Sequence, residues 1–118
     1  MAEHERWLRR LALHDESFIE SVLTTDLDKL EASGLDAKTR ALIRLAAVLA
    51  AGAEPASCHS AVAMALNAGA TAEEVVGVLM AVAPVIGIVR TVATASHVAA
   101  ALGYDIDAAL ERLDGDPP

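Results

Sequence analysis

The stretch Ala65–Leu79 reads ALNAGATAEEVVGVL and contains the end of one helix and the start of the next. Gly69 follows an apolar run, where a glycine favours the left-handed backbone that ends a helix. Thr71 and Glu74 have the spacing of a capping box, in which each side chain accepts a hydrogen bond from the other residue's backbone N–H. The stretch therefore predicts two helices joined by a tight turn, with Glu73 as a solvated charge.

Helix signals continue on the N-terminal side of this turn. Pro55 favours a helix start, and the helix that it opens is expected to run to Gly69. Before it, Asp36 is a candidate N-cap for the helix AKTRALIRLAAVLAAG, which Gly52 can close. This helix has an apolar stripe at helical spacing, formed by Leu42, Leu45, Ala46 and Leu49.

The rest of the chain also predicts helices, and no alternating strand pattern appears. Pro84 is expected to end or kink the helix after Thr71, and the last long helix is expected from about Val85 to Leu102. DIDAALERLD predicts a short C-terminal helix, and DLDKLEASG predicts a short helical turn that ends at Gly34. Two further helices are expected near the N-terminus, from about Glu3 to Leu13 and after an N-cap at Asp15. We expect one all-α domain with an N-terminal segment 1–33, a core 34–113 and a frayed tail 114–118.

Composition restricts the possible partners. Of 118 residues, 54% are hydrophobic but only 3% aromatic, so small residues must form the core. A short chain cannot easily bury that much apolar surface alone, which predicts a homo-oligomer. The net charge of −8 argues against a nucleic-acid partner and against an anionic membrane surface. The uncharged run 75–89 is shorter than a membrane span, which needs about 18–20 apolar residues.

The chain has one cysteine, Cys58, which is followed directly by His59. One cysteine excludes an intrachain disulfide and favours a reducing, cytoplasmic compartment, and the charged N-terminus MAEHERWLRR lacks the apolar run of a signal peptide. Successive helical residues point about 100° apart, so Cys58 and His59 cannot pair face to face. A stripe of Cys58, Val62, Ala65 and Leu66 favours a buried structural thiol, whereas a position in the first helical turn would favour a reactive one. His59 lies toward the more polar side.

A second candidate site lies on the last long helix. Arg90, Thr94 and His97 share one face at i, i+4 and i+7. An arginine, a hydroxyl and an imidazole in line could bind a carboxylate and move a proton, although they could equally form the polar face of a surface helix. His4 and His14 have no metal-ligand spacing to each other or to Cys58, so we expect no metal.

Three stretches together resemble the carboxymuconolactone decarboxylase family, which has the AhpD-like fold: LDAKTRALIRLAAVLAAG, HSAVAMALNAGATAEEVVGVLMAVAPVIGIVR and ALGYDIDAAL. The resemblance covers about two thirds of the chain, and its strongest element is the turn described above. It implies an all-helical subunit that assembles into trimers or hexamers. In one branch of the family, a Cys-x-x-Cys followed by a histidine on the same helix, with an upstream glutamate, reduces peroxides. In the other branch, a helix histidine acts on a small carboxylated lactone.

The resemblance also shows where this chain departs from the family pattern. Aligned on Gly69 and the capping box, the two redox cysteines would fall on Glu54 and Ser57, and the histidine on Ala61. The upstream glutamate would fall near Ala41 or Leu42. Cys58 misses the second of these redox positions by one residue, and the second thiol that would resolve an oxidised cysteine is absent.

Three functions remain open on the sequence. The first is a cofactor-free lyase or isomerase acting on a small carboxylated lactone or related acid, with Arg90 and Thr94 binding the substrate and His97 or His59 in acid–base catalysis. The second is an alkylhydroperoxidase-like antioxidant enzyme that uses Cys58. The third is a non-catalytic binding or assembly module.

Overall fold

The computed structural model describes residues 2–24 and 33–104, and the regular elements in these ranges are all α-helices. They are α1 (Glu3–Ala12), α2 (Glu16–Leu23), α4 (Ala37–Ala50), α5 (Pro55–Asn67), α6 (Ala72–Ile86) and α7 (Ile88–Ala101). The all-α prediction is confirmed for this part of the chain. The predicted C-terminal helix at 105–114, the tail 114–118 and most of the predicted turn at 26–34 lie outside the described residues. No described helix combines the length and the apolar character needed to cross a membrane.

The chain divides into two units, Met1–Asp36 and Ala37–Pro118. In the first unit, α1 and α2 meet at His14, which has a positive φ of 57°. Asp15 caps α2 as predicted, because its carboxylate accepts a hydrogen bond of 3.2 Å from the Phe18 N–H. Arg10 links the two helices: its Nε donates to Asp15 at 2.9 Å, and its guanidinium lies 4.7 Å from the centre of the Phe18 ring. Phe18 is buried, whereas no residue of α1 is.

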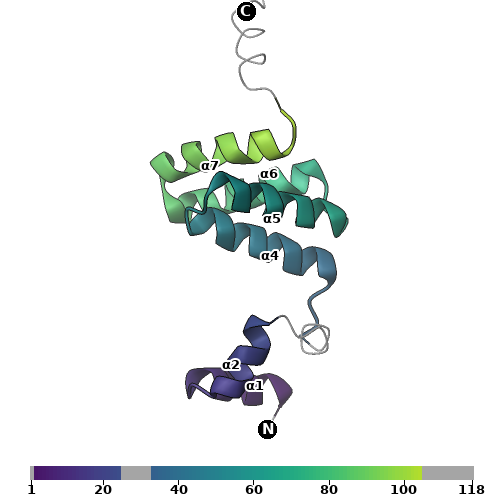
Figure 1. Cartoon of the computed structure of the whole chain (residues 1–118), viewed down its shortest axis with the longest axis vertical. Helices are drawn as coiled ribbons and strands as arrows, with labels where there is room; N and C mark the ends of the chain where they lie inside the picture. The colour runs from purple at the N-terminus through teal and green to yellow at the C-terminus, as the bar shows by residue number, and fades with distance from the viewer. Residues whose placement is uncertain (1, 25–32, 105–118) are drawn as a thin grey trace, which may run out of the picture. The chain divides into compact units, whose positions relative to one another are not determined.

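In the described part of the second unit, residues 37–104, the four helices α4 to α7 pack together (Figure 1). Helix α4 packs against α5 and α6, and α7 packs against the same two helices. Small and medium-sized apolar side chains fill the space between them, as the low aromatic content predicts. The core consists of Ala41, Leu45, Leu49, Cys58, Ala61, Val62, Ala65, Ala70, Val75, Leu79 and Val98. Because these side chains are small, the helices must approach closely, so the loss of even one leucine leaves a gap that its neighbours cannot fill.

Glycines with positive φ follow α4, α5 and α7, at Gly52, Gly69 and Gly103. At the end of α7, the Gly103 N–H donates to the Ala100 carbonyl at 3.1 Å, and the Tyr104 N–H donates to the Ala99 carbonyl at 2.9 Å. This pair of bonds is the Schellman motif, which satisfies carbonyls left free at a helix end and turns the chain back. The direction in which the chain leaves α7 is therefore fixed by local hydrogen bonds.

Two details differ from the sequence prediction. Pro84 does not end α6, which continues to Ile86; the break falls at Gly87, whose φ is 84°. The last long helix therefore begins at Ile88 rather than at Val85. A proline so close to a helix end removes only one late hydrogen bond, whereas the Gly87 backbone, with φ 84° and ψ 168°, cannot continue a right-handed helix. On α5, Leu66 was expected on the buried stripe but is 39% exposed. Ala61 is buried in the core instead.

The capping box at the start of α6 is present, and it also reaches another helix. The Thr71 N–H donates to Glu74 at 3.0 Å, and the Glu74 N–H donates to the Thr71 hydroxyl at 3.1 Å. The second carboxylate oxygen of Glu74 lies 2.9 Å from Lys38 Nζ on α4. The hydrogen bond from Lys38, followed by the one from the Thr71 backbone, lowers the pKa of Glu74 below its ordinary value. One carboxylate therefore connects α4 to the N-terminus of α6.

This carboxylate should make part of the stability acid-sensitive. Because the pKa of Glu74 is lower in the folded chain, its contribution is fully present above the unfolded value of 4.5 and is lost as pH falls through the folded value. We expect Glu74→Gln to reduce the loss of stability on acidification, measured by denaturant unfolding at a series of pH values. The matched control is Glu73→Gln on the same helical turn. Equal pH profiles for the two variants would contradict the assignment.

Candidate functional site

The predicted residues Arg90, Thr94 and His97 line one pocket, called here the α7 pocket. Its volume is about 490 Å³, and the three polar residues lie along its α7 wall. Residues that follow α4 and the last residue of α6 supply the rest of the lining. The lining residues are Ala51, Gly52, Ala53, Ile86, Val89, Arg90, Ala93, Thr94 and His97. Helical spacing alone placed the three polar residues on one face; the structure adds the wall that makes this face concave.

Arg90 is held against the end of α4. Its Nη1 donates a hydrogen bond of 2.9 Å to the carbonyl of Ala50, the last residue of that helix. A positive side chain at this position satisfies a free carbonyl and suits the negative end of the helix dipole. A Cβ placed on Gly52 would lie 3.7 Å from Arg90 Nε, so the guanidinium passes close to this backbone. A guanidinium has five N–H donors, and the others remain able to bind a carboxylate.

Thr94 and His97 differ in how well their polar atoms are satisfied. Thr94 is 3% exposed, and its hydroxyl donates within α7, to the Arg90 carbonyl at 2.8 Å or to the Thr91 carbonyl at 3.1 Å. It could therefore only accept a hydrogen bond from a ligand. His97 Nδ1 is buried and has no hydrogen-bond partner among the described residues. A hydrogen on Nδ1 would be a buried donor without an acceptor, so a neutral ring is expected to carry its hydrogen on Nε2. In this tautomer, the Nε2–H can donate a hydrogen bond to a ligand.

Cys58 and His59 are not brought together with these residues. Cys58 is fully buried in the core of the second unit, where its thiol lies 3.7 Å from the Ala53 carbonyl. Burial raises the pKa of the Cys58 thiol, which disfavours the reactive thiolate. His59 is exposed on α5 and is not among the residues that line the α7 pocket. The geometry therefore favours a structural role for Cys58 over a reactive one.

We expect Cys58 to react slowly with an alkylating agent until the protein unfolds. Because the thiol is buried and its pKa is raised, alkylation should accelerate by about 10²-fold or more in denaturant, after correction for the direct effect of denaturant on a model thiol. The matched control moves the thiol by one residue, to the exposed neighbour, in a Cys58→Ala, His59→Cys variant. Rapid reaction of native Cys58 at neutral pH would show that the thiol is accessible and ionised.

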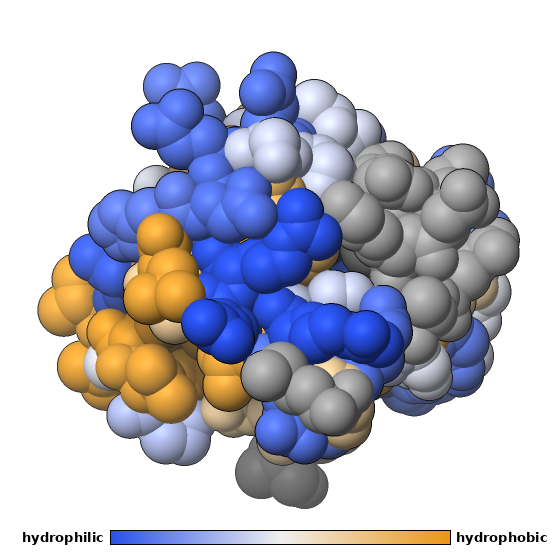
Figure 2. Space-filling model, turned by 90° about the horizontal axis from the view of Figure 1, so that it is seen from below, coloured by the Kyte–Doolittle hydropathy of each residue, from blue (hydrophilic) through white to orange (hydrophobic). Residues whose placement is uncertain are grey.

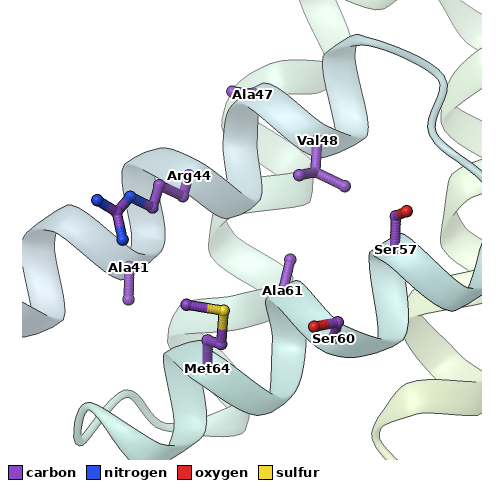
Figure 3. Close-up of a pocket in the computed structure, with 8 residues that line it drawn as sticks. All are labelled: Ala41, Arg44, Ala47, Val48, Ser57, Ser60, Ala61 and Met64. Carbon is purple, nitrogen blue, oxygen red and sulfur yellow. The ribbon is translucent and has the colours of Figure 1, made fainter. Parts of the chain in front are cut away.

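A second pocket, called here the α4–α5 pocket, lies between those two helices (Figure 3). Its volume is about 450 Å³, and its lining residues are Ala41, Arg44, Ala47, Val48, Ser57, Ser60, Ala61 and Met64. In Figure 3, Arg44 lies toward one end and Ser57 toward the other, with Ala61 and Met64 pointing into the space between the helices. Arg44 is exposed and has no hydrogen-bond or ion-pair partner among the described residues.

The α4–α5 pocket contains positions at which the family resemblance implies catalytic residues. By the resemblance, Ser57 and Ala61 align with the second redox cysteine and the helix histidine, and the upstream glutamate would fall near Ala41 or Leu42, of which Ala41 lines this pocket. None of these side chains can act as a thiol, a general acid or a general base at neutral pH. The pocket is present, but those reactive groups are not among its lining residues. What remains for binding is one guanidinium and the hydroxyls of Ser57 and Ser60.

Sequence reasoning did not find Arg44, Ser57 and Ser60 as a group. The helical pattern places Arg44 outside the apolar stripe of α4, and nothing in that pattern relates it to Ser57 or Ser60. Their proximity depends on the packing of α4 against α5, which no local pattern specifies. In the α7 pocket, sequence reasoning missed the contact of Arg90 with the backbone at Ala50 and Gly52. These residues lie forty and thirty-eight positions before Arg90 in the sequence. The available signal was Gly52 itself, a predicted helix end where another group can approach the backbone closely.

The sequence was compared with known proteins and families. No curated protein matches the chain, and no solved structure matches it. The Carboxymuconolactone decarboxylase family does match, over residues 18–101. This range covers most of the chain and includes both pockets and the turn between α5 and α6. The chain therefore belongs to the carboxymuconolactone decarboxylase family.

Proposed function

We propose that this protein is a cofactor-free lyase or isomerase that acts on a small carboxylated lactone or a related acid in the α7 pocket. The observation that supports the proposal most directly is a cationic side chain and an unsatisfied imidazole nitrogen in one pocket. A volume of about 490 Å³ is within the usual range for small-molecule sites. Family membership supports the substrate class, which the resemblance links to carboxylated lactones.

The two residues suit different parts of such a reaction. Arg90 would bind a carboxylate of the ligand through the N–H groups that do not contact Ala50. In a decarboxylation, the bond to the departing CO₂ breaks and its electron pair stays on carbon, where an adjacent lactone carbonyl can accept it as an enolate. This carbon must then take up a proton. The proposed donor is the doubly protonated form of His97, which would give up its Nε2 proton and be left as a neutral ring. Thr94 would accept a hydrogen bond from a hydroxyl of the ligand.

A ligand screen with carboxylated lactones and muconate-like acids tests this proposal. Binding should raise the melting temperature of the wild-type protein, and Arg90→Ala should abolish that shift. The matched control is Arg44→Ala, which removes an arginine from the other pocket. Since Arg90 also caps α4, each shift is measured against the ligand-free form of the same variant. Equal shifts in Arg90→Ala and wild-type protein would exclude the α7 pocket as the binding site.

A second candidate function is a non-catalytic binding module that uses the α4–α5 pocket. The supporting observation is the replacement of the implied catalytic groups by Ala41, Ser57 and Ala61, while the cavity and Arg44 remain. Such a pocket would bind a small ligand with one anionic end and an apolar body. The same screen distinguishes the two candidates, because a shift lost in Arg44→Ala but kept in Arg90→Ala supports the binding module. A thiol peroxidase is the least supported alternative, since Cys58 is buried and has a raised pKa.

We also propose that the protein is a homo-oligomer that uses the junction of α6 and α7. Val85, Ile88 and Val89 are 83%, 81% and 83% exposed, respectively, and Val92 nearby is 62% exposed. Apolar side chains so exposed usually mark a contact surface. Figure 2 shows that apolar residues gather in one area of the surface that it presents and are not spread evenly over it. Val89 also lines the α7 pocket, so the proposed interface adjoins the proposed site.

Light scattering coupled to size-exclusion chromatography measures this assembly. The wild-type protein should elute as a trimer or hexamer, and Ile88→Glu should shift it toward the monomer, because a buried unpaired carboxylate is unfavourable in an interface. The matched control is Leu66→Glu, a partly exposed apolar position on α5. A monomeric wild-type protein would contradict the proposed assembly.

A further inference from the structure

Three arcs divide the surface of α7, because successive helical residues are rotated by about 100°. One arc contains the buried Val98 and packs in the core. A second arc, with Arg90 and His97, lines the α7 pocket. The third, called here the exposed arc, contains Ile88 and Val92, which are 81% and 62% exposed and line neither pocket described above. The exposed arc is therefore an apolar surface directly beside the pocket.

Val89 stands at the boundary between the exposed arc and the pocket. It is 83% exposed, and it lines the α7 pocket together with Ala93, which is also exposed. Two lining residues that follow α4, Ala51 and Gly52, are exposed as well. In a single subunit the pocket is therefore open to solvent. Any partner that packs on the exposed arc lies at the rim of the pocket, because Val89 belongs to both.

The distribution of charge along the chain favours a second copy as that partner. Two copies that each carry a net charge of −8 repel each other, unless they meet where acidic groups are absent. None of the 17 acidic residues lies within residues 75–104, which include most of α6 and all of α7. A two-fold axis through the exposed arc would place this acid-free, apolar surface against itself. The chain is thus complementary to its own copy at the rim of the α7 pocket.

From these observations we infer that a second copy, seated on the exposed arc, closes the α7 pocket, so that the site is complete only in the assembly. The inference deepens the proposed function, since it rests on the same pocket and on the same contact surface. An ion pair open to water contributes little to binding, whereas the same pair is much stronger where water is excluded. Closure therefore strengthens the bond between Arg90 and a ligand carboxylate. By linkage, the ligand strengthens the assembly by the same factor.

The reactivity of His97 tests closure without any ligand. Diethyl pyrocarbonate acylates an accessible neutral imidazole, and mass spectrometry of peptides locates the modified histidine. We expect His97 to react about tenfold or more slowly in assembled wild-type protein than in monomeric Ile88→Glu, whereas His59, exposed on α5, should react equally in both. Ile88→Lys should match Ile88→Glu, because loss of the partner does not depend on the sign of the introduced charge. Equal His97 rates, a monomeric wild-type protein or an Ile88→Glu variant that stays assembled would each overturn the inference.

Isothermal titration calorimetry with a carboxylated lactone tests the link to binding. The lactone should bind about tenfold or more weakly to Ile88→Glu than to wild-type protein, and Leu66→Glu on α5 should leave the affinity unchanged. Equal affinity of the assembly and the monomer would show that the pocket binds without a second copy, which overturns the inference. If no carboxylated lactone binds while assembly protects His97, the proposed function fails and closure of the pocket is supported.

Discussion

Leu45→Ala should lower the free energy of unfolding by about 2–5 kcal/mol, the usual range for a buried leucine. Leu45 is fully buried in the middle of α4, the helix that packs against both α5 and α6. The neighbouring core residues include Ala41, Ala61 and Ala65, whose short side chains cannot extend into the space that the variant leaves. We therefore expect the cost to fall in the upper half of that range. Urea unfolding followed by circular dichroism measures it.

The matched control is Ile43→Ala on the same helix. Ile43 is 51% exposed, so its loss removes a similar number of carbon atoms without opening an internal cavity. We expect a change of less than about 1 kcal/mol for this variant. A protein of this size commonly has a total stability of about 5–15 kcal/mol, so Leu45→Ala could leave a large unfolded fraction at 37 °C. Similar destabilisation by both variants would mean that Leu45 is not enclosed in the core.

His97→Gln should reduce turnover of the carboxylated substrate by about 10²–10⁴-fold, the usual contribution of a general acid or base. Glutamine keeps a hydrogen-bond donor but cannot transfer a proton at neutral pH. Because Arg90 is unchanged, ligand affinity should fall much less than the rate, so kcat should decrease while KM stays nearly constant. Steady-state measurement of substrate loss and CO₂ release tests both parts of the prediction.

His59→Gln is the control for this experiment, since His59 is the other histidine considered from the sequence. It is exposed on α5 and does not line the α7 pocket, so its replacement should leave kcat unchanged. Loss of activity in His59→Gln but not in His97→Gln would move the site to α5. If the wild-type protein binds a ligand but does not convert it, the binding module becomes the supported function.

The helix ends show how far the sequence could predict this fold. Asp15, Thr71 and Gly52 act within a few residues of their own positions, so local rules place them correctly. Pro84 and Gly87 gave competing signals three residues apart, and the sequence prediction chose the proline. The chain breaks at the glycine because its backbone, with φ 84° and ψ 168°, is far from helical values, whereas a proline near the last turn is tolerated. A local rule of this kind does not say which of two adjacent signals prevails.

The candidate sites were less predictable because they combine distant segments. Helical spacing placed Arg90, Thr94 and His97 on one face, and the structure places all three in one pocket. Spacing could not show that Arg90 contacts the Ala50 carbonyl, because that contact depends on how α7 packs against the end of α4. Nor could it show that Thr94 is buried with its hydroxyl bonded to its own helix. The same limit applies to Leu66 and Ala61, since the burial of each depends on which neighbouring helix covers that side of α5.

The hydrogen bond from Arg90 to Ala50 has a consequence for how ligand binding could be observed. A ligand carboxylate that draws the Arg90 guanidinium away from the Ala50 carbonyl would weaken the last turn of α4. A carboxylate that binds the guanidinium while the bond to Ala50 is kept would stabilise that turn. The backbone amides of Ala51, Gly52 and Ala53 lie at this position and line the same pocket. Their NMR chemical shifts should therefore report occupancy of the α7 pocket without any assay of turnover, so the end of α4 serves as a built-in spectroscopic probe of the site.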